Sequence, residues 1–314
     1  MQNKKSKIEA YYKKKEKLAR RDYNLEFNVI LNDINPLLAF FDNKLVIAKN
    51  SSIQGEFIQQ RTSRLNLSTT SPIDSVFYGK NKIYGLNVDL TSSKLAQNSE
   101  VLANLILTST SQHLGTMDFD STSIDATWDK RGIEFETKIH QTDSPNRAKL
   151  FGMLHLQDDT TIINFNNPSN LQFYNDHWNF DKDNEINMNP LGVVFDRFIL
   201  SNKRTVNSQI GIQGTISDSI HTPLEITLKQ IDLGSFAQVF KTDINGSLNG
   251  NFTIANLFHK PDIQGELAVE NLMYKQMLIG DVDGKIKWID DRERLAIDLT
   301  GFRKNRYILS LMGS

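Results

Sequence analysis

Residues 248–272 read LNGNFTIANLFHKPDIQGELAVENL, and alternating runs in this stretch place a glycine between apolar residues. Leu248, Gly250 and Phe252 occupy alternate positions, and so do Ile263, Gly265 and Leu267. Because successive side chains of a strand point to opposite faces, each glycine falls on the apolar face of its own strand. The stretch therefore predicts strands whose apolar side carries glycine where a core normally needs a side chain.

The same period-two alternation recurs along the chain. It is clearest at residues 25–31, 86–90, 133–139, 224–228 and 295–299. Asn, Asp, Ser, Gly or Pro follows each run, as expected where strands give way to turns. The pattern predicts an all-β protein whose strands have one apolar and one polar face.

Helical periodicity is confined to three places. Residues 4–21 predict a basic helix, and shorter helical turns are expected at 34–41 and 233–240. A thin apolar stripe on residues 1–21 is compatible with contact at a membrane surface. Because that stripe is narrow, a solvated connecting helix is the favoured interpretation.

Composition excludes several classes of protein. The chain of 314 residues has 36 Lys and Arg against 37 Asp and Glu, so its total charge indicates no nucleic-acid partner. It has no Cys, which removes disulfides, thiolate metal sites and thiol catalysis. There is no apolar run long enough to cross a membrane and no secretory signal. We expect no cofactor. The lack of Cys suits an oxidising compartment such as a bacterial periplasm, although many cytosolic proteins lack it too, and if the protein is exported, its signal lies outside this chain.

A sheet with one apolar face has to bury that face against another layer. A β-sandwich, a closed barrel or a β-solenoid would each achieve this, and alternation alone does not separate them. The chain offers almost no helix as a covering layer.

A short motif, apolar-x-Gly-x-apolar with polar residues between, repeats along the chain. Its copies are IQGEF at 53–57, IQGTI at 212–216, LNGNF at 248–252, IQGEL at 263–267 and VDGKI at 282–286. The central glycines are Gly55, Gly214, Gly250, Gly265 and Gly284.

A longer pattern joins two distant stretches, residues 25–57 and 224–252. Asp33 aligns with Asp232, and Gly55 aligns with Gly250. Two copies of a long module favour an extended, stacked architecture over a closed globule. We therefore divide the chain into a connecting helix at 1–21 and one repetitive β segment at 22–314, with copies beginning near 22 and 222.

The stretch INGSLNGNFTIANLFHKPDIQGELAVENLMYKQMLIGDVDGKIKWIDDRERLAIDLTG, residues 244–301, resembles the translocation and assembly module TamB family of the AsmA-like group. Residues 177–236 are similar to the Bacteroidetes-type members. The resemblance rests on a rhythm of short phrases and involves no catalytic signature. It covers roughly residues 170–314 well and residues 22–60 more weakly.

The resemblance implies an elongated antiparallel sheet curled into an open apolar groove, a β-taco. It also implies a periplasmic segment of an inner-membrane-anchored protein of a Gram-negative bacterium, with the anchor outside this chain. Such proteins shield phospholipid acyl chains between the inner and outer membranes and support outer-membrane protein assembly and secretion. The implied partners are phospholipid acyl chains and an outer-membrane barrel assembly protein of the TamA type. A β-sandwich or solenoid module without lipid transport is the alternative.

The inward parity of the strands predicts which residues line the groove. These are Leu25, Phe27, Val29, Leu31, Leu86, Val88, Leu90, Ile133, Phe135, Ile139, Ile210, Ile212, Leu224, Ile226, Leu228, Leu267, Val269, Leu295, Ile297 and Leu299. The motif glycines are expected to leave room for an acyl chain and to let the sheet bend. Alternatively, they mark bulges or tight bends in an ordinary sheet.

Signals for an enzyme are weak. Asp118 with Asp120, and Asp158 with Asp159, could supply paired carboxylates, but both pairs fall where solvated turns are expected. Residues 179–185, NFDKDNE, hint at a calcium loop, yet Asn184 stands where the sharp turn needs glycine. We predict no catalytic residues, no metal ligands and no enzymatic activity.

Overall fold

The computed structural model describes residues 22–60, 62–95, 100–174, 176–202, 207–217, 222–239, 242–257, 261–289, 294–303 and 306–313. The predicted helix at residues 1–21 lies outside this part of the chain. The chain divides into two compact units, Met1–Thr142 and Asp143–Ser314.

The predicted all-β, antiparallel architecture is confirmed. Every strand pairing in the described residues is antiparallel, and each predicted alternating run falls inside a strand. The two predicted short helices are also present, α2 (Asn35–Phe41) and α3 (Leu233–Val239). The β-branched and aromatic residues of the alternating runs suit a pleated sheet with one apolar side.

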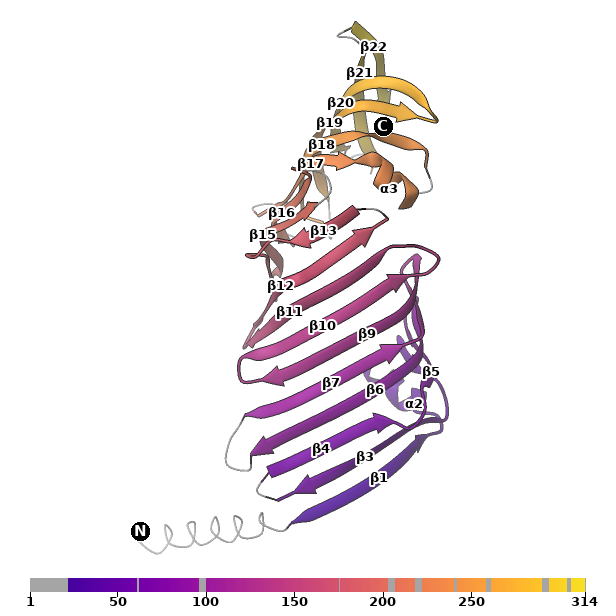
Figure 1. Ribbon diagram of the computed structural model, residues 1–314, viewed down its shortest axis with the longest axis vertical. Helices are drawn as coiled ribbons and strands as arrows, with labels where there is room; N and C mark the ends of the chain where they lie inside the picture. The colour runs from indigo at the N-terminus through magenta and orange to yellow at the C-terminus, as the bar shows by residue number, and fades with distance from the viewer. Residues whose placement is uncertain are drawn as a thin grey trace, which may run out of the picture. The chain divides into compact units, whose positions relative to one another are not determined.

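Unit 1 forms a ladder of neighbouring strands (Figure 1). The strands are β1 (Tyr23–Leu31), β2 (Leu45–Ile47), β3 (Ser51–Gln59), β4 (Thr62–Thr69), β5 (Ile73–Tyr78), β6 (Asn81–Leu95), β7 (Val101–Ser109), β8 (Ser111–Leu114), β9 (Met117–Asp129) and β10 (Gly132–Gln141). The main order is β1–β3–β4–β6–β7–β9–β10. Consecutive long strands are therefore neighbours, which short hairpin turns permit.

A second group of pairings occupies one end of unit 1. The first half of β6 pairs with β5 and β8, and β5 in turn pairs with β2. Gly85 separates the two halves of β6 with a φ of 60°, a left-handed conformation that favours glycine. A Cβ there would overlap the side chain of Thr110, which lies between β7 and β8.

Unit 2 continues the antiparallel plan in its own ladder. Its strands are β11 (Arg147–Gln157), β12 (Thr160–Phe173), β13 (Asp176–Phe180), β14 (Glu185–Asn189), β15 (Gly192–Asn202), β16 (Gln209–Ile216), β17 (Leu224–Asp232), β18 (Ile244–Ala255), β19 (Asp262–Tyr274), β20 (Met277–Ile289), β21 (Arg294–Arg303) and β22 (Arg306–Gly313). Strands β13 and β14 share the space between β12 and β15. From β15 to β22 each strand pairs with the next.

The two copies of the long repeat share a strand–helix–strand unit. In both copies an aspartate fixes the turn into the helix: Asp33 lies two residues after β1, and Asp232 is the last residue of β17. Asp33 Oδ1 accepts the backbone N–H of Asn35 at 3.1 Å, and Asp232 Oδ1 accepts that of Gly234 at 3.0 Å. Asp residues favour such turns because the short carboxylate reaches the backbone two residues on.

A compact apolar cluster lies in unit 2. Trp178, Phe198, Leu200 and Ile231 are buried, and several partly buried aromatic residues pack around them. The rings of Phe165 and Phe180 stack with centroids 4.7 Å apart. The other apolar residues buried in the described part of the chain are Leu224, Ala237, Val269 and Val282. All of them belong to unit 2, so unit 1 has no comparable core among its described residues.

Candidate functional site: an apolar sheet face

The predicted lining residues of unit 1 share one face of its sheet. Directly opposed residues of an antiparallel pair point to the same face, so the register traces that face from strand to strand. One row runs through Phe27, Gly55, Leu67, Leu90, Leu105, Ala126 and Phe135. Strand parity adds Leu25, Val29, Leu31, Leu86, Val88, Ile133 and Ile139 to the same face.

The neighbouring row, on the other face, is polar throughout. It runs through Glu26, Glu56, Asn66, Thr91, Asn104, Thr127 and Glu134. Asn104 donates through Nδ2 to Asp125 Oδ1 at 2.9 Å and to Thr127 Oγ1 at 3.2 Å, so hydrogen bonds tie neighbouring strands together. The two neighbouring rows of unit 1 thus differ sharply in chemistry.

Unit 2 shows the same separation. One apolar row runs through Phe198, Ile212, Ile226, Phe252, Gly265, Ile286 and Ile297. Parity places Ile210, Leu224, Leu228, Leu267, Val269, Leu295 and Leu299 on this face as well. All predicted lining residues of this unit are thus on one side of its sheet.

Burial of the apolar face differs between the two units. In unit 1, Leu25 is 57% exposed, and Val29 and Trp128 are exposed as well. The remaining predicted residues of that unit are half-buried. In unit 2, Leu224 and Val269 are buried, and the other predicted residues are half-buried. The apolar face of unit 1 is therefore less buried than that of unit 2.

The expectation that the motif glycines leave open space is wrong. Gly55 faces Phe27 directly across the strand pair, and a Cβ on Gly55 would lie 2.5 Å from Phe27 Cζ. Gly265 faces Phe252, and its Cβ would lie 2.9 Å from Phe252 Cε1. At both sites the aromatic ring lies across the glycine, so the apparent gap is already filled.

The other motif glycines are restricted in related ways. A Cβ on Gly250 would also meet the Phe252 ring, at 2.8 Å from Cε2. At Gly284 it would meet Leu299 Cδ2 at 2.7 Å and Leu267 Cδ1 at 2.9 Å. Gly214 has a φ of 100° and lies against the Pro223 carbonyl, so its backbone alone requires glycine. A large apolar side chain of the same or a neighbouring strand therefore lies where a Cβ would project at Gly55, Gly250, Gly265 and Gly284, and at Gly55 the backbone oxygen of Asn66 lies there as well.

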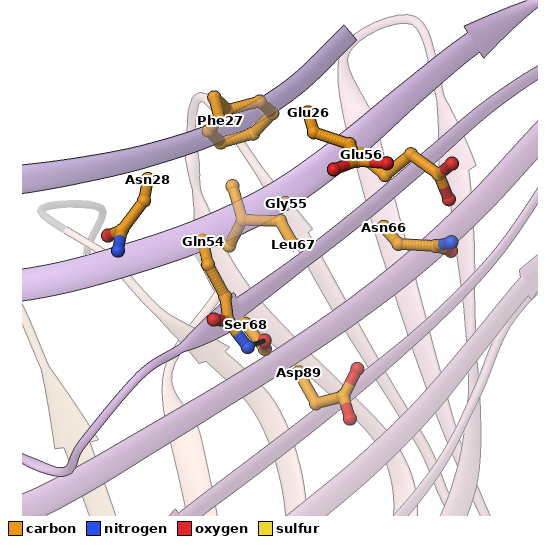
Figure 2. A pocket seen from close by; sticks show the side chains of 10 residues that line it. All are labelled: Glu26, Phe27, Asn28, Gln54, Gly55, Glu56, Asn66, Leu67, Ser68 and Asp89. Carbon is orange, nitrogen blue, oxygen red and sulfur yellow. Dashed lines mark hydrogen bonds between the residues drawn. The ribbon is translucent and has the colours of Figure 1, made fainter. Parts of the chain in front are cut away.

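The polar face carries shallow hollows at the positions of some of these glycines, where the glycine backbone forms part of the floor. Figure 2 shows one of about 590 Å³ over β1, β3 and β4, with Gly55 in its floor. Most of its side chains belong to the polar rows, including Glu26, Glu56, Asn66 and Asp89. A similar hollow in unit 2 lies over β18, β19 and β20. These hollows lie on the face opposite to the predicted groove.

Charges on the polar face interact mostly in exposed pairs. Lys285 Nζ lies 3.0 Å from Glu266 Oε1, and this hydrogen bond raises the pKa of Lys285. Near α2, the hydrogen bond from Lys49 lowers the pKa of Asp33 below its ordinary value of 3.8. Both pairs are open to water and add little to stability.

The weak enzyme signals correspond to hydrogen-bonded side chains. Asp118 Oδ1 lies 2.7 Å from His113 Nδ1, whereas Asp120 pairs with His140 and Thr142. The two carboxylates thus have separate partners. Asp158 and Asp159 are exposed between β11 and β12. No group of three or more His, Asp or Glu in the described residues is arranged to hold a metal ion.

Asn184, in the segment compared with a calcium loop, has a structural role. It is buried, donates through Nδ2 to the Ile199 carbonyl at 3.0 Å, and accepts the Ile199 N–H at 2.8 Å. Asn35 makes the same two bonds with Ile47. In both places an Asn side chain replaces one residue of a strand ladder, which satisfies backbone groups that would otherwise be unpaired.

Comparison with known proteins gives no match to a family model, a curated protein or a solved structure. None of the helices in the described parts of the chain combines the length and hydropathy needed to cross a bilayer.

Proposed function

We propose that the apolar sheet face holds the acyl chains of phospholipids and shields them from water. The observation that carries this proposal is the open apolar face of unit 1. The residue rows on this face are apolar from β1 to β10. None of these residues belongs to the set of buried apolar residues described above, all of which lie in unit 2. A covered core would bury them, so this face suits a ligand that is itself apolar and long.

The energetics favour such a surface as a passive path. Exposing an acyl chain to water costs about 0.8 kcal/mol per methylene, so two long chains meet a barrier on the order of 20 kcal/mol. A continuous row of apolar side chains would contact the acyl chains along their length and so avoid this cost of exposing them to water. The half-buried Leu67, Leu90 and Leu105, which oppose one another in register, form such a row at the centre of unit 1.

The resemblance to the TamB family supplies the cellular setting of the proposal. The chain would be a periplasmic segment of an envelope protein that spans the gap between the inner and outer membranes. Phospholipid would pass along the apolar face, and the protein would support assembly of outer-membrane proteins with a TamA-type barrel partner.

Native mass spectrometry tests the lipid proposal. The protein is purified without detergent, incubated with phospholipid vesicles, separated from them and measured intact. We expect phospholipid adducts on the folded chain and their loss in Leu90→Gln. Thr91→Gln, on the neighbouring polar row, is the matched control and should retain them. A spectrum without adducts, or equal adducts on both variants, would overturn the proposal.

One observation favours a second candidate, strand addition to a partner protein. Among the described strands, β1 pairs only with β3, so its other edge is open for pairing. Ile30→Lys alters the polar face of β1 and leaves the apolar face intact. Loss of binding to a barrel partner together with unchanged lipid adducts would support strand addition, whereas unchanged binding would contradict it.

A further inference from the structure

Helix α2 presents its apolar side chains to solvent. Phe40 is 90% exposed and Phe41 is 82% exposed, and no residue of the helix is buried. The helix is nevertheless held in place, because Asn35 at its start makes two hydrogen bonds with Ile47 at the end of β2. The aromatic residues at its other end therefore lie beside the start of β2.

Further exposed apolar residues lie at the same end of unit 1. The turn after α2 leads into β2 at Leu45, which opposes Tyr78 at the end of β5. Leu114 and Met117 close the β8–β9 turn at the same end of the ladder. Tyr78, Leu114 and Met117 are all exposed. We call Phe40, Phe41, Tyr78, Leu114 and Met117 the helix rim.

Lysines accompany the helix rim. Lys44 precedes β2, Lys80 lies in the β5–β6 turn and Lys82 is the second residue of β6, and all three are exposed. The Gly79 N–H donates to the Lys44 carbonyl at 3.0 Å, so the turns that carry Lys44 and Lys80 are adjacent.

Two carboxylates face the same end, and both have partners. Asp42 accepts the backbone N–H of Lys44 at 2.9 Å, and Asp118 lies 2.7 Å from His113 Nδ1. Three exposed lysines therefore accompany the two carboxylates of Asp42 and Asp118 among the exposed aromatic and aliphatic side chains.

The β19–β20 turn, in unit 2, has a similar composition. Tyr274 and Met277 are exposed there, and Lys275 Nζ lies 5.4 Å from the centroid of the Tyr274 ring. The same types of side chain thus recur at a strand end in each unit.

We propose that the helix rim binds the surface of an anionic phospholipid bilayer. Phe and Tyr side chains enter the boundary between head groups and acyl chains, and Lys side chains reach the anionic head groups. A surface for an ordinary protein partner would instead be depleted in Lys. This site is distinct from the apolar sheet face and would bring that face to the membrane from which lipid is taken or to which it is delivered.

Vesicle flotation tests the proposal with phosphatidylcholine vesicles, with and without phosphatidylglycerol. We expect stronger binding to the anionic vesicles. The double variant Phe40→Ser, Phe41→Ser should weaken binding at least about tenfold. Each of Lys44→Gln, Lys80→Gln and Lys82→Gln should weaken binding to anionic vesicles about fivefold and leave the weaker binding to neutral vesicles unchanged.

Leu191→Ser is the matched control, because Leu191 is 85% exposed on a turn of unit 2 and has no part in the helix rim. It should not change flotation. Binding that survives the Phe and Lys variants would overturn the proposal. A second outcome would also overturn it: sedimentation shows that wild type self-associates and that the double Phe variant is monomeric, while neither protein floats with vesicles. The helix rim would then join two copies of the chain. Lipid adducts in mass spectrometry should be the same in the rim variants and wild type, which separates this proposal from that of the apolar face.

Discussion

The ring of Phe252 on β18 lies across Gly265, the residue directly opposite it on β19. Phe27 and Gly55 repeat this arrangement between β1 and β3. An aromatic ring over a cross-strand glycine shields the glycine backbone and gains contact area that a larger residue would block. At Gly55 and Gly265, the motif glycine is therefore one half of a packing pair.

Gly265→Ala should destabilise the protein by about 1–3 kcal/mol, the usual range for an overpacked site. The new methyl group would overlap the Phe252 ring and force it out of place. Urea denaturation measures the loss. Gly211→Ala is the control, because a Cβ there would lie 3.7 Å from Thr227 Cβ, an ordinary contact. Equal stability of the two variants would contradict the packing pair.

A double-mutant cycle isolates the contact itself. If the ring is the obstacle, Gly265→Ala should cost much less in a Phe252→Ala background, with a coupling of about 0.5–3 kcal/mol. Additive losses would instead assign the glycine to its backbone, the situation already found at Gly214.

Asn184→Ala should cost about 2 kcal/mol or more, because it leaves the N–H and carbonyl of Ile199 without their side-chain partners. Thermal or urea unfolding measures this change. Asn166→Ala, at an exposed position of β12, should stay within about 0.5 kcal/mol of wild type. If both variants unfold alike, the Asn184 side chain does not contribute to the ladder.

A charged side chain introduced on the apolar face should destabilise the protein where the face is buried and leave stability almost unchanged where the face is exposed. Val269→Arg should unfold unit 2, since Val269 is 7% exposed and a buried unpaired charge is too costly. Leu25→Arg should melt close to wild type, because the guanidinium group stays in water, and it should hold less lipid. Circular dichroism on heating gives the stability, and native mass spectrometry gives the lipid occupancy. Unfolding of Leu25→Arg would indicate that the face of unit 1 is covered.

Local pattern was sufficient to predict the strands that carry the alternating runs, the two short helices and the shared face of the predicted lining residues in each unit. Alternation reports side-chain direction directly, so Leu90 and Ile226 could be assigned without knowing their partners. The aligned aspartates, Asp33 and Asp232, indicated a repeat, and the structure shows that each accepts a backbone N–H two residues on. These features depend on a few consecutive residues.

The meaning of the glycines depended on strand register, which no local window contains. Phe27 lies far from Gly55 in sequence, and only the β1–β3 pairing brings them together. Phe252 beside Gly250 was a visible clue that a ring could lie over a glycine. The clustering of Trp178 with Ile231 and the exposure of Phe40 likewise depend on packing between distant segments.

Site-specific photo-crosslinking tests the central claim most directly. A photoreactive amino acid is placed at Val88, on the apolar face, and separately at the adjacent Asn87, on the polar face. Each protein is incubated with phospholipid vesicles, irradiated and analysed for covalent lipid adducts. The apolar-face account predicts adducts at position 88 and none at position 87. No adduct at position 88, or equal adducts at both positions, would contradict it.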